Sequence, residues 1–403
     1  MSVYIIRPKQ TLETLSAGLI SVRLAAEDRP EQIQEVFSNR MKNPVRQDIH
    51  RWISENSPKV EQITKSESDT RITGVTIVDM SDEDAERLRQ ELPDATVQRD
   101  QPIELIRPRR PLAAPKKTLR ADDLWHLRAI GLTSARKSGY TGSGAGVTVA
   151  VLDTGIDSTH LEIEGRVTKA VTFDVKQWQS IPMNSSRDTD GHGTHVTGLI
   201  CGKKVGVAPG VKVLNGVMIP QGNGNLSDFI LALEWAGSQP EVQIINMSAG
   251  IPGFYPDMQV AVDGAIAAGV LCVFATGNEG RNKTRSPGNY IDPVSIGAID
   301  RESHVASFSS SGTLIVENHQ YSVPDLVAPG VQVYSSVMGG GYEAWDGTSM
   351  ATPIVSGVAA LILEKHPDIT IPDLTEELIS TCRNLRQPVD RQGAGLVQVK
   401  AAL

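Results

Sequence analysis

Three short motifs in this sequence carry the residue types of nucleophilic catalysis. Asp153 follows the apolar run VTVAVL, His192 lies in GHGTHV, and Ser349 lies in GTSMATP. A serine hydroxyl attacks an acyl carbon only when a base removes its proton, and imidazole has a suitable pKa for that role. The imidazole in turn needs a buried carboxylate that fixes its tautomer. The motifs therefore predict a triad, with Ser349 as the nucleophile, His192 as the base and Asp153 as the orienting acid.

A fourth motif, ATGNEG, supplies a hydrogen-bond donor for the charge that such an attack creates. The side-chain amide of Asn278 and the backbone N–H of Ser349 are the two predicted donors of an oxyanion hole. Each residue also has an ordinary interpretation by itself, as a turn residue, a helix cap or a structural histidine. The chain order Asp, His, Ser, with every role filled once, favours catalysis.

Short apolar runs alternate with segments of helical periodicity, such as Leu226–Ala236. The runs are Val147–Leu152, Val211–Leu214, Val242–Met247 and Val270–Ala275. Continuous apolar runs are typical of parallel strands that are buried on both faces. The expected fold is α/β, with a doubly wound and mostly parallel sheet. Ligands bind beyond the carboxyl ends of such strands, which is where Asp153 and Asn278 follow their runs.

The segments DTGID, GHGTHV, INMSAG, ATGNEG and GTSMATP together resemble the signature segments of the subtilisin-like serine protease family, in the family's order. The resemblance extends over nearly all of Gly139–Leu403. It implies a serine endopeptidase that cleaves extended polypeptide segments through an acyl-enzyme intermediate. It also implies the catalytic roles given above for Asp153, His192, Ser349 and Asn278.

The same resemblance assigns the walls of a peptide cleft. Ser248-Ala249-Gly250 resembles the family strand that pairs with the substrate backbone, and Gly222-Asn223-Gly224 resembles its partner on the other side. A protein or peptide substrate held between them would be recognised by strand addition. An ordinary glycine turn is the alternative for the Gly222 segment. His195 is expected to be a packing residue and not a second catalyst.

Arg285 is a predicted determinant of specificity. Counting back from Pro287 places Arg285 near the base of the pocket for P1, the residue before the cleaved bond. Acidic or polar P1 side chains would then be favoured.

Residues 1–106 predict a small α+β domain. Val3–Arg7, Ile72–Asp79 and Ala95–Arg99 are expected to be strands, a helix follows Ser81, and Arg29–Ser54 is expected to be helical. The segment GVTIVDMSDEDAERLRQELPDATVQRD resembles the inhibitory, ferredoxin-like propeptide of many subtilisin-like proteases. The resemblance implies a zymogen with its own N-terminal domain as intramolecular inhibitor. A permanent regulatory or partner-binding domain is the alternative.

Residues 107–120, RPRRPLAAPKKTLR, separate this domain from a catalytic domain at 121–403. Their proline and basic residues predict an exposed, extended linker with a processing site. A solvated linker is favoured over a binding patch for Arg107, Arg109 and Arg110.

Composition disfavours other classes of protein. A formal net charge of −8 argues against a general attraction to nucleic acid or to anionic membranes. The longest apolar run, Ile354–Leu363, is too short to span a bilayer. The sequence starts without a secretory signal and its three cysteines cannot all pair, so a cytoplasmic location is expected unless a signal has been trimmed.

The chemistry predicted above requires no cofactor and no metal. After His192 the chain reaches Gly206-Val207-Ala208-Pro209 sooner than in many relatives, so the usual tight calcium site is expected to be absent, whereas weaker calcium sites elsewhere stay open. A polar insertion at Thr313–Pro324 has no functional interpretation from the sequence.

Two other function classes share part of this pattern. A serine hydrolase of esters would use the same triad, but on other folds it typically shows a G-x-S-x-G elbow, and Ser349 lies in GTSMA. A catalytically dead peptide-binding scaffold would normally have lost a catalytic residue, and none is replaced here.

Overall fold

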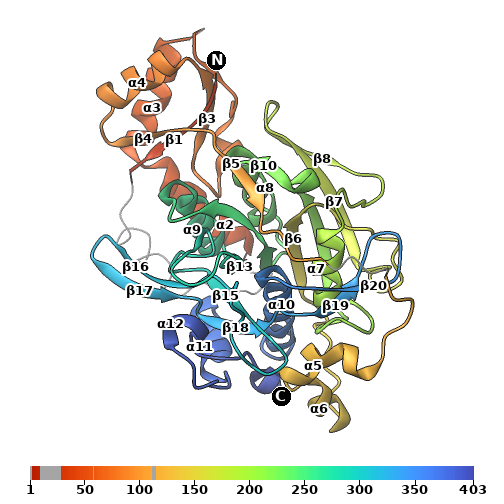
Figure 1. Cartoon of the computed structure of the whole chain (residues 1–403). Helices are drawn as coiled ribbons and strands as arrows, with labels where there is room; N and C mark the ends of the chain where they lie inside the picture. The colour runs from red at the N-terminus through yellow and green to blue at the C-terminus, as the bar shows by residue number, and fades with distance from the viewer. Residues whose placement is uncertain (1, 10–28, 58, 111–114) are drawn as a thin grey trace.

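The apolar runs of the sequence form the centre of an eight-stranded sheet in the computed structural model, which describes residues 2–9, 29–57, 59–110 and 115–403 (Figure 1). The strand order is β18-β15-β13-β11-β6-β9-β7-β8, and all neighbours are parallel except the antiparallel pair β7 and β8. The strands are β6 Thr148–Asp153, β7 Val167–Asp174, β8 Gln179–Pro182, β9 Lys212–Val217, β11 Ile244–Met247, β13 Leu271–Ala275, β15 Val294–Ile299 and β18 Leu326–Pro329. The predicted α/β fold is confirmed.

Helices cover this sheet because its central strands are apolar on both sides. Every residue of β6 and of β13 is buried. The helix α7 (His192–Cys201) packs against α10 (Thr348–Lys365), and α8 (Leu226–Gly237) packs against α9 (Gln259–Ala267). We call this sheet and the helices that cover it the large unit. Its shorter α-helices are α5 Trp125–Ala129, α6 Leu132–Lys137, α11 Ile371–Ser380 and α12 Val389–Gln392.

The N-terminal unit is an antiparallel sheet with the order β2-β3-β1-β4. Its strands are β1 Ser2–Pro8, β2 Glu61–Gln62, β3 Thr76–Met80 and β4 Ala95–Arg99, and its α-helices are α2 Arg29–Met41, α3 Pro44–Glu55 and α4 Asp82–Glu91. The element order is βααββαβ, which is the ferredoxin-like arrangement predicted from the sequence with two helices, α2 and α3, in place of the first one. The helical region expected at 29–54 is two helices, because Asn43 caps a new helix and Pro44 occupies its first turn.

One strand, β5 (Pro102–Leu105), follows the N-terminal unit but pairs with the large unit (Figure 1). It lies between β10 (Asn223–Asn225) and β12 (Ala249–Pro252), and β14 (Arg285–Ser286) completes this second sheet. Both pairings of β5 are antiparallel. The chain thus adds one of its own strands to a sheet that is otherwise built from the large unit.

The arginines of the basic segment after β5 are exposed, as expected from the sequence, but they also contact the large unit. Arg107 donates to the carbonyl oxygen of Gln221 at 3.1 Å. The backbone of Arg109 pairs with that of Asp346, and its guanidinium lies 5.5 Å from the centre of the Phe308 ring. Composition alone cannot reveal these partners, because they come from distant parts of the chain. Residues 111–114 of the predicted linker lie outside the described residues.

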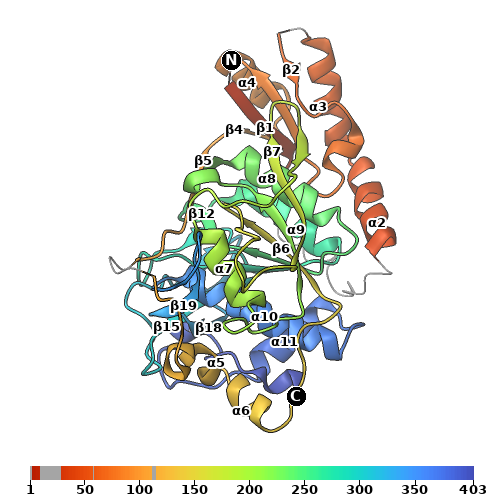
Figure 2. The ribbon, with the colours of Figure 1, turned by 90° about the vertical axis from the view of Figure 1, so that its right-hand side faces the viewer.

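The two units also meet through a buried carboxylate. Glu234 of α8 accepts the backbone N–H groups of Ile72 and Thr73 at 2.8–3.1 Å. Burial raises the pKa of the Glu234 carboxyl, and the donated hydrogen bonds act in the opposite direction. Elsewhere along the interface, α2 lies beside α9 (Figure 2).

The large unit also contains two antiparallel hairpins. The insertion at Thr313–Pro324 forms β16 (Gly312–Val316) and β17 (His319–Val323), and β19 (Val333–Ser336) pairs with β20 (Tyr342–Trp345). The three cysteines all lie in the described residues and form no disulfide bond. In the part of the chain that the structure describes, no helix combines the length and apolar character needed to cross a membrane.

Replacing the buried carboxylate should loosen the contact between the two units. Glu234→Ala leaves the N–H groups of Ile72 and Thr73 without an acceptor, at about 1–3 kcal/mol for each buried unpaired group. In a Ser349→Ala background, hydrogen–deuterium exchange at residues 72–73 should become faster. Glu241→Gln, which removes an exposed carboxylate beside Lys169, should leave that exchange unchanged. Equal exchange in both variants would contradict the role given to Glu234.

Candidate active site

The predicted catalytic side chains come from three elements of the large unit. Asp153 is the last residue of β6, His192 is the first residue of α7, and Ser349 lies in the first turn of α10. The two helices pack against each other. All three side chains are fully buried in the intact chain.

Asp153 and His192 form a direct pair. Nδ1 of His192 lies 2.8 Å and 2.9 Å from the two carboxylate oxygens of Asp153, and Oδ1 of Asp153 also accepts the N–H of Thr154 at 2.7 Å. Because an ionised carboxylate only accepts hydrogen bonds, Nδ1 carries the proton and Nε2 keeps a free lone pair. Within the described residues, Nε2 of His192 has no hydrogen-bond partner. The imidazole is therefore held in the tautomer that accepts a proton at Nε2.

Ser349 and Asn278 contact two successive carbonyl groups of the segment after β5. The Ser349 hydroxyl donates to the carbonyl oxygen of Ile106 at 2.8 Å, and the Asn278 amide nitrogen donates to that of Arg107 at 3.1 Å. The orientation of the amide is fixed, because its oxygen accepts the backbone N–H of Thr348 at 2.9 Å. The peptide bond between Ile106 and Arg107 therefore lies between the two predicted catalytic groups.

One predicted wall of the cleft holds β5 as it would hold a peptide. Ala249 and Gly250 pair with β5 in antiparallel register, and the N–H of Ile106 donates to the carbonyl oxygen of Ser248 at 3.0 Å. A Cβ atom at Gly250 would lie 2.4 Å from the carbonyl oxygen of Ser286. Only glycine therefore fits between β5 and β14 at this place.

The opposite wall combines the two interpretations that the sequence allowed. Asn223 and Gly224 pair with β5 as a strand. Gly222 lies in the turn before that strand with φ +81°, a left-handed conformation that favours glycine. A Cβ atom there would also approach the Arg107 guanidinium to 2.7 Å.

Arg285 lies in β14, next to the first wall, and its guanidinium is already paired. Nε donates to the Glu279 carboxylate at 2.7 Å, and Nη1 donates to the carbonyl oxygen of Gly250 at 3.1 Å. Since Glu279 compensates its charge, Arg285 offers little attraction to an acidic P1 side chain. This pairing argues against the P1 preference expected from the sequence, which stays a prediction.

His195 packs beside this site without touching the predicted triad acid. Its ring stacks on Trp345 with 4.2 Å between the ring centroids, and Nε2 lies 3.1 Å from the carbonyl oxygen of Glu343. Burial lowers the pKa of His195 to about 3, so the ring is neutral at ordinary pH. It is the packing residue that the sequence predicted.

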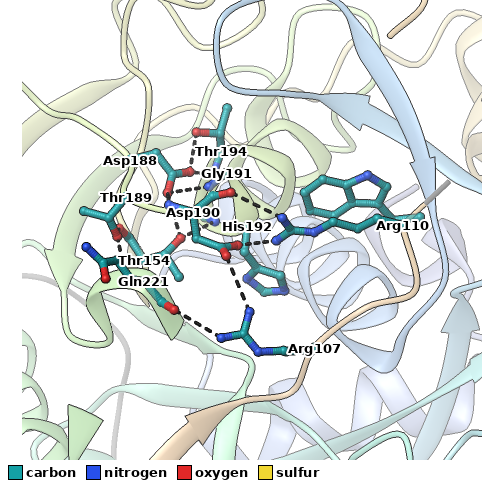
Figure 3. Close-up of polar contacts among 12 residues, drawn as sticks. Arg107, Arg110, Thr154, Asp188, Thr189, Asp190, Gly191, His192, Thr194 and Gln221 are labelled. Carbon is teal, nitrogen blue, oxygen red and sulfur yellow. Dashed lines mark hydrogen bonds and ion pairs between the residues drawn. The ribbon is translucent and has the colours of Figure 1, made fainter. Parts of the chain in front are cut away.

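Sequence reasoning missed Asp188, which organises the loop before α7 (Figure 3). Its carboxylate accepts the N–H groups of Asp190, Gly191 and Thr194 at 2.8–3.0 Å and the hydroxyl of Thr154 at 2.8 Å. Asp188 thereby ties the start of α7 to the residue after Asp153. The run DTD directly before GHGTHV was the available signal, since acidic residues there suit a helix N-terminus.

The turn after α7 is held by a carboxylate. Glu162 accepts the N–H groups of Lys204 at 2.6 Å and Val205 at 3.3 Å, and the hydroxyl of Tyr342 at 2.7 Å. These donors occupy both carboxylate oxygens of Glu162, and two of them lie between His192 and Gly206, the segment that is short for a calcium loop. Across the described residues, no group of three or more His, Cys, Asp or Glu side chains is arranged to hold a metal ion. The absence of a tight calcium site stays a prediction.

Comparison with known sequences gives extended matches to the large unit. The model of the subtilase family, peptidase S8, matches residues 144–395. Subtilisin of Bacillus pumilus is 38% identical over 287 residues, which cover 68% of this chain and 96% of that protein. Subtilisin E of Bacillus subtilis (strain 168) is 38% identical over 287 residues, which cover 68% of this chain and 69% of that protein.

A solved structure resembles the whole chain. Fervidolysin from Fervidobacterium pennivorans, described as a keratinolytic enzyme related to subtilisin, matches with a TM-score of 0.68 at 21% sequence identity. The match covers 100% of this chain and 60% of that chain, so the present chain spans less than two thirds of its length. At this identity the likeness concerns the fold.

Proposed function

Because the chain belongs to the subtilase family and is a subtilisin-like serine endopeptidase, we propose that Asp153, His192 and Ser349 are its catalytic triad and that residues 1–106 make it a self-inhibited zymogen. One observation carries this proposal: the Ser349 hydroxyl donates to the backbone carbonyl of Ile106, the residue directly after the strand β5 that is seated between the cleft walls. A nucleophile and an extended peptide are thus in contact within one chain.

His192 acts first as a base and then as an acid. When the Ser349 hydroxyl turns away from the carbonyl oxygen of Ile106, its proton passes to Nε2 of His192 while Oγ bonds to the carbonyl carbon. Asp153 stabilises the imidazolium through Nδ1. His192 then protonates the leaving amine, and water hydrolyses the acyl-enzyme by the same proton transfers.

Asn278 and the backbone N–H of Ser349 stabilise the oxyanion. The bond from Thr348 holds the amide of Asn278 with its N–H₂ group towards the cleft, so the donor needs no reorganisation during the reaction. In the intact chain this amide contacts the carbonyl of Arg107, one residue beyond the carbonyl that meets Ser349. Attack at Ile106 therefore requires a small shift of the segment towards Asn278.

The position of β5 supports the proposal that the chain is a self-inhibited zymogen. A strand between the two walls uses the backbone groups that a substrate would use, so substrate is excluded while β5 stays in place. We assign the processing site to the bond between Ile106 and Arg107, since the carbonyl of Ile106 meets Ser349 and its N–H meets Ser248. The cytoplasmic location expected from the sequence is separate from this proposal and stays a prediction.

A fluorophosphonate probe tests the nucleophile. After incubation, the wild type should be labelled at Ser349 and a folded Ser349→Ala variant should not, since only an activated serine attacks the phosphorus. Unlabelled wild type from the same incubation should hydrolyse a peptide substrate, and Ser349→Ala should leave that peptide intact. Labelling at another residue would contradict the triad. Labelling with ester turnover but no peptide turnover would instead indicate an ester hydrolase.

Removing the oxyanion donor tests the role of Asn278. Asn278→Ala should lower kcat by about 10²–10³, the loss known for removing such a donor in subtilisin, with little change in KM. Asn184→Ala, which alters an exposed asparagine after β8, is the control. Steady-state kinetics on one peptide measure both variants. A loss below about threefold would mean that Asn278 does not stabilise the transition state.

A further inference from the structure

Two arginines after β5 meet one carboxylate beside the proposed catalytic histidine (Figure 3). Arg110 donates through Nη2 to Oδ1 of Asp190 and through Nη1 to its carbonyl oxygen at 3.3 Å. Arg107 lies with Nη1 at 3.5 Å from Oδ2 of Asp190, and its Nη2 donates to the carbonyl oxygen of Gln221 at 3.1 Å. We call the two side-chain oxygens and the carbonyl oxygen of Asp190, together with the carbonyl oxygen of Gln221, the acceptor cage.

The acceptor cage is held by bonds that do not involve the arginines. Asp188 accepts the N–H of Asp190 at 3.0 Å. The hydroxyl of Thr189 accepts the N–H of Gln221 at 2.8 Å and donates to the carbonyl oxygen of Thr154 at 2.6 Å. Both halves of the cage are therefore fixed to the strand end that carries the triad acid. The cage is preorganised for whatever cation enters it.

The chemistry of the cage suits a guanidinium. It offers acceptors only, spread over two loops, and arginine presents donors in a planar fork that can reach several of them at once. Arg110 also lies over the Trp345 ring, 4.3 Å from its centroid, which a planar cation exploits best. In the described part of the chain, the ion pairs of Asp190 are those with Arg107 and Arg110.

The cage lies on the leaving-group side of the cleft. Ile106 donates its N–H to Ser248, and its carbonyl oxygen accepts the hydroxyl of Ser349. The peptide bond that faces Ser349 is therefore the one between Ile106 and Arg107, and every residue from Arg107 onward lies on its leaving-group side. Arg107 is then the first residue after that bond, P1′, and Arg110 is the fourth, P4′. The Asp190 side chain is 14% exposed with both arginines present. Departure of this segment would leave a partly desolvated carboxylate facing the cleft without its cations.

We propose that the acceptor cage is a primed-side subsite for arginine, so that this endopeptidase selects polypeptides with arginine at P1′ and gains further from arginine at P4′. This inference rests on the proposed function, and in particular on the bond that meets Ser349. In the intact chain Arg107 and Arg110 occupy the subsite, so the linker has the primed half of a preferred substrate.

Two peptides with a common first half test the subsite. Both carry Pro-Ile-Glu-Leu-Ile before the cleaved bond, and Arg-Pro-Arg-Arg follows it in one and Ala-Pro-Arg-Ala in the other. The full-chain protein is incubated and divided: one portion is labelled with a fluorophosphonate to count active sites, and the unlabelled portion is assayed, with rates expressed per active site. The wild type should show kcat/KM about tenfold higher for the arginine peptide, as two charge-assisted but partly exposed contacts would give. Asp190→Asn, which keeps the shape and the backbone N–H, should bring the ratio within about twofold of unity.

The controls distinguish a failure of the arginine subsite from a failure of the proposed function. Glu164→Gln removes a carboxylate that pairs with Lys203 beyond the far end of α7, and it should keep the tenfold ratio. Equal cleavage of both peptides by active wild type, or a ratio that survives Asp190→Asn, would overturn the subsite while the proposed function stands. If no serine is labelled and neither peptide is cleaved, the proposed function fails and the subsite fails with it.

Discussion

The antiparallel pairing of β5 is the interaction on which the arrangement of the cleft depends. Ile103 and Leu105 point into the protein and are buried, whereas Glu104 between them is exposed. A slip of one residue would exchange these faces, so the register is strongly specified. The register then decides which carbonyl group meets the hydroxyl of Ser349 and which residues extend beyond it. The position of the proposed scissile bond thus follows from the burial of two apolar side chains.

The N-terminal unit and the residues that lead into β5 form hydrogen bonds with both ends of α8, and these bonds help to hold β5 in place. At the start of α8, the Asp100 carboxylate accepts the N–H of Ser227 at 3.0 Å and its hydroxyl at 2.6 Å. A carboxylate at a helix N-terminus is favoured by the helix dipole. Towards the other end, Glu234 accepts the N–H groups of Ile72 and Thr73. Since Asp100 lies two residues before β5, its hydrogen bonds to Ser227 restrain the start of that strand beside the cleft while the chain is intact.

Local sequence predicted most of the fold and the separate parts of the site. Strand β6 and Asp153 were predictable because an apolar run and the polar residue at its end are neighbours in the chain. The docking of the linker was not, because Arg110 and Asp190 are 80 positions apart and nothing near either residue indicates the contact. The pairing of Arg285 with Glu279 was missed for a related reason. The two residues are six positions apart, but composition does not show how the loop between them turns to bring them together.

The most direct test of this account is the intact mass and the new N-terminal sequence of the wild type and of Ser349→Ala after matched incubation. The wild type is expected to split between Ile106 and Arg107, and Ser349→Ala is expected to stay whole. A wild type that stays whole would make β5 a standing part of the fold and residues 1–106 a permanent regulatory domain. A cut in the Ser349→Ala variant, or a first cut at another bond, would contradict the claim that Ser349 attacks the carbonyl group it contacts.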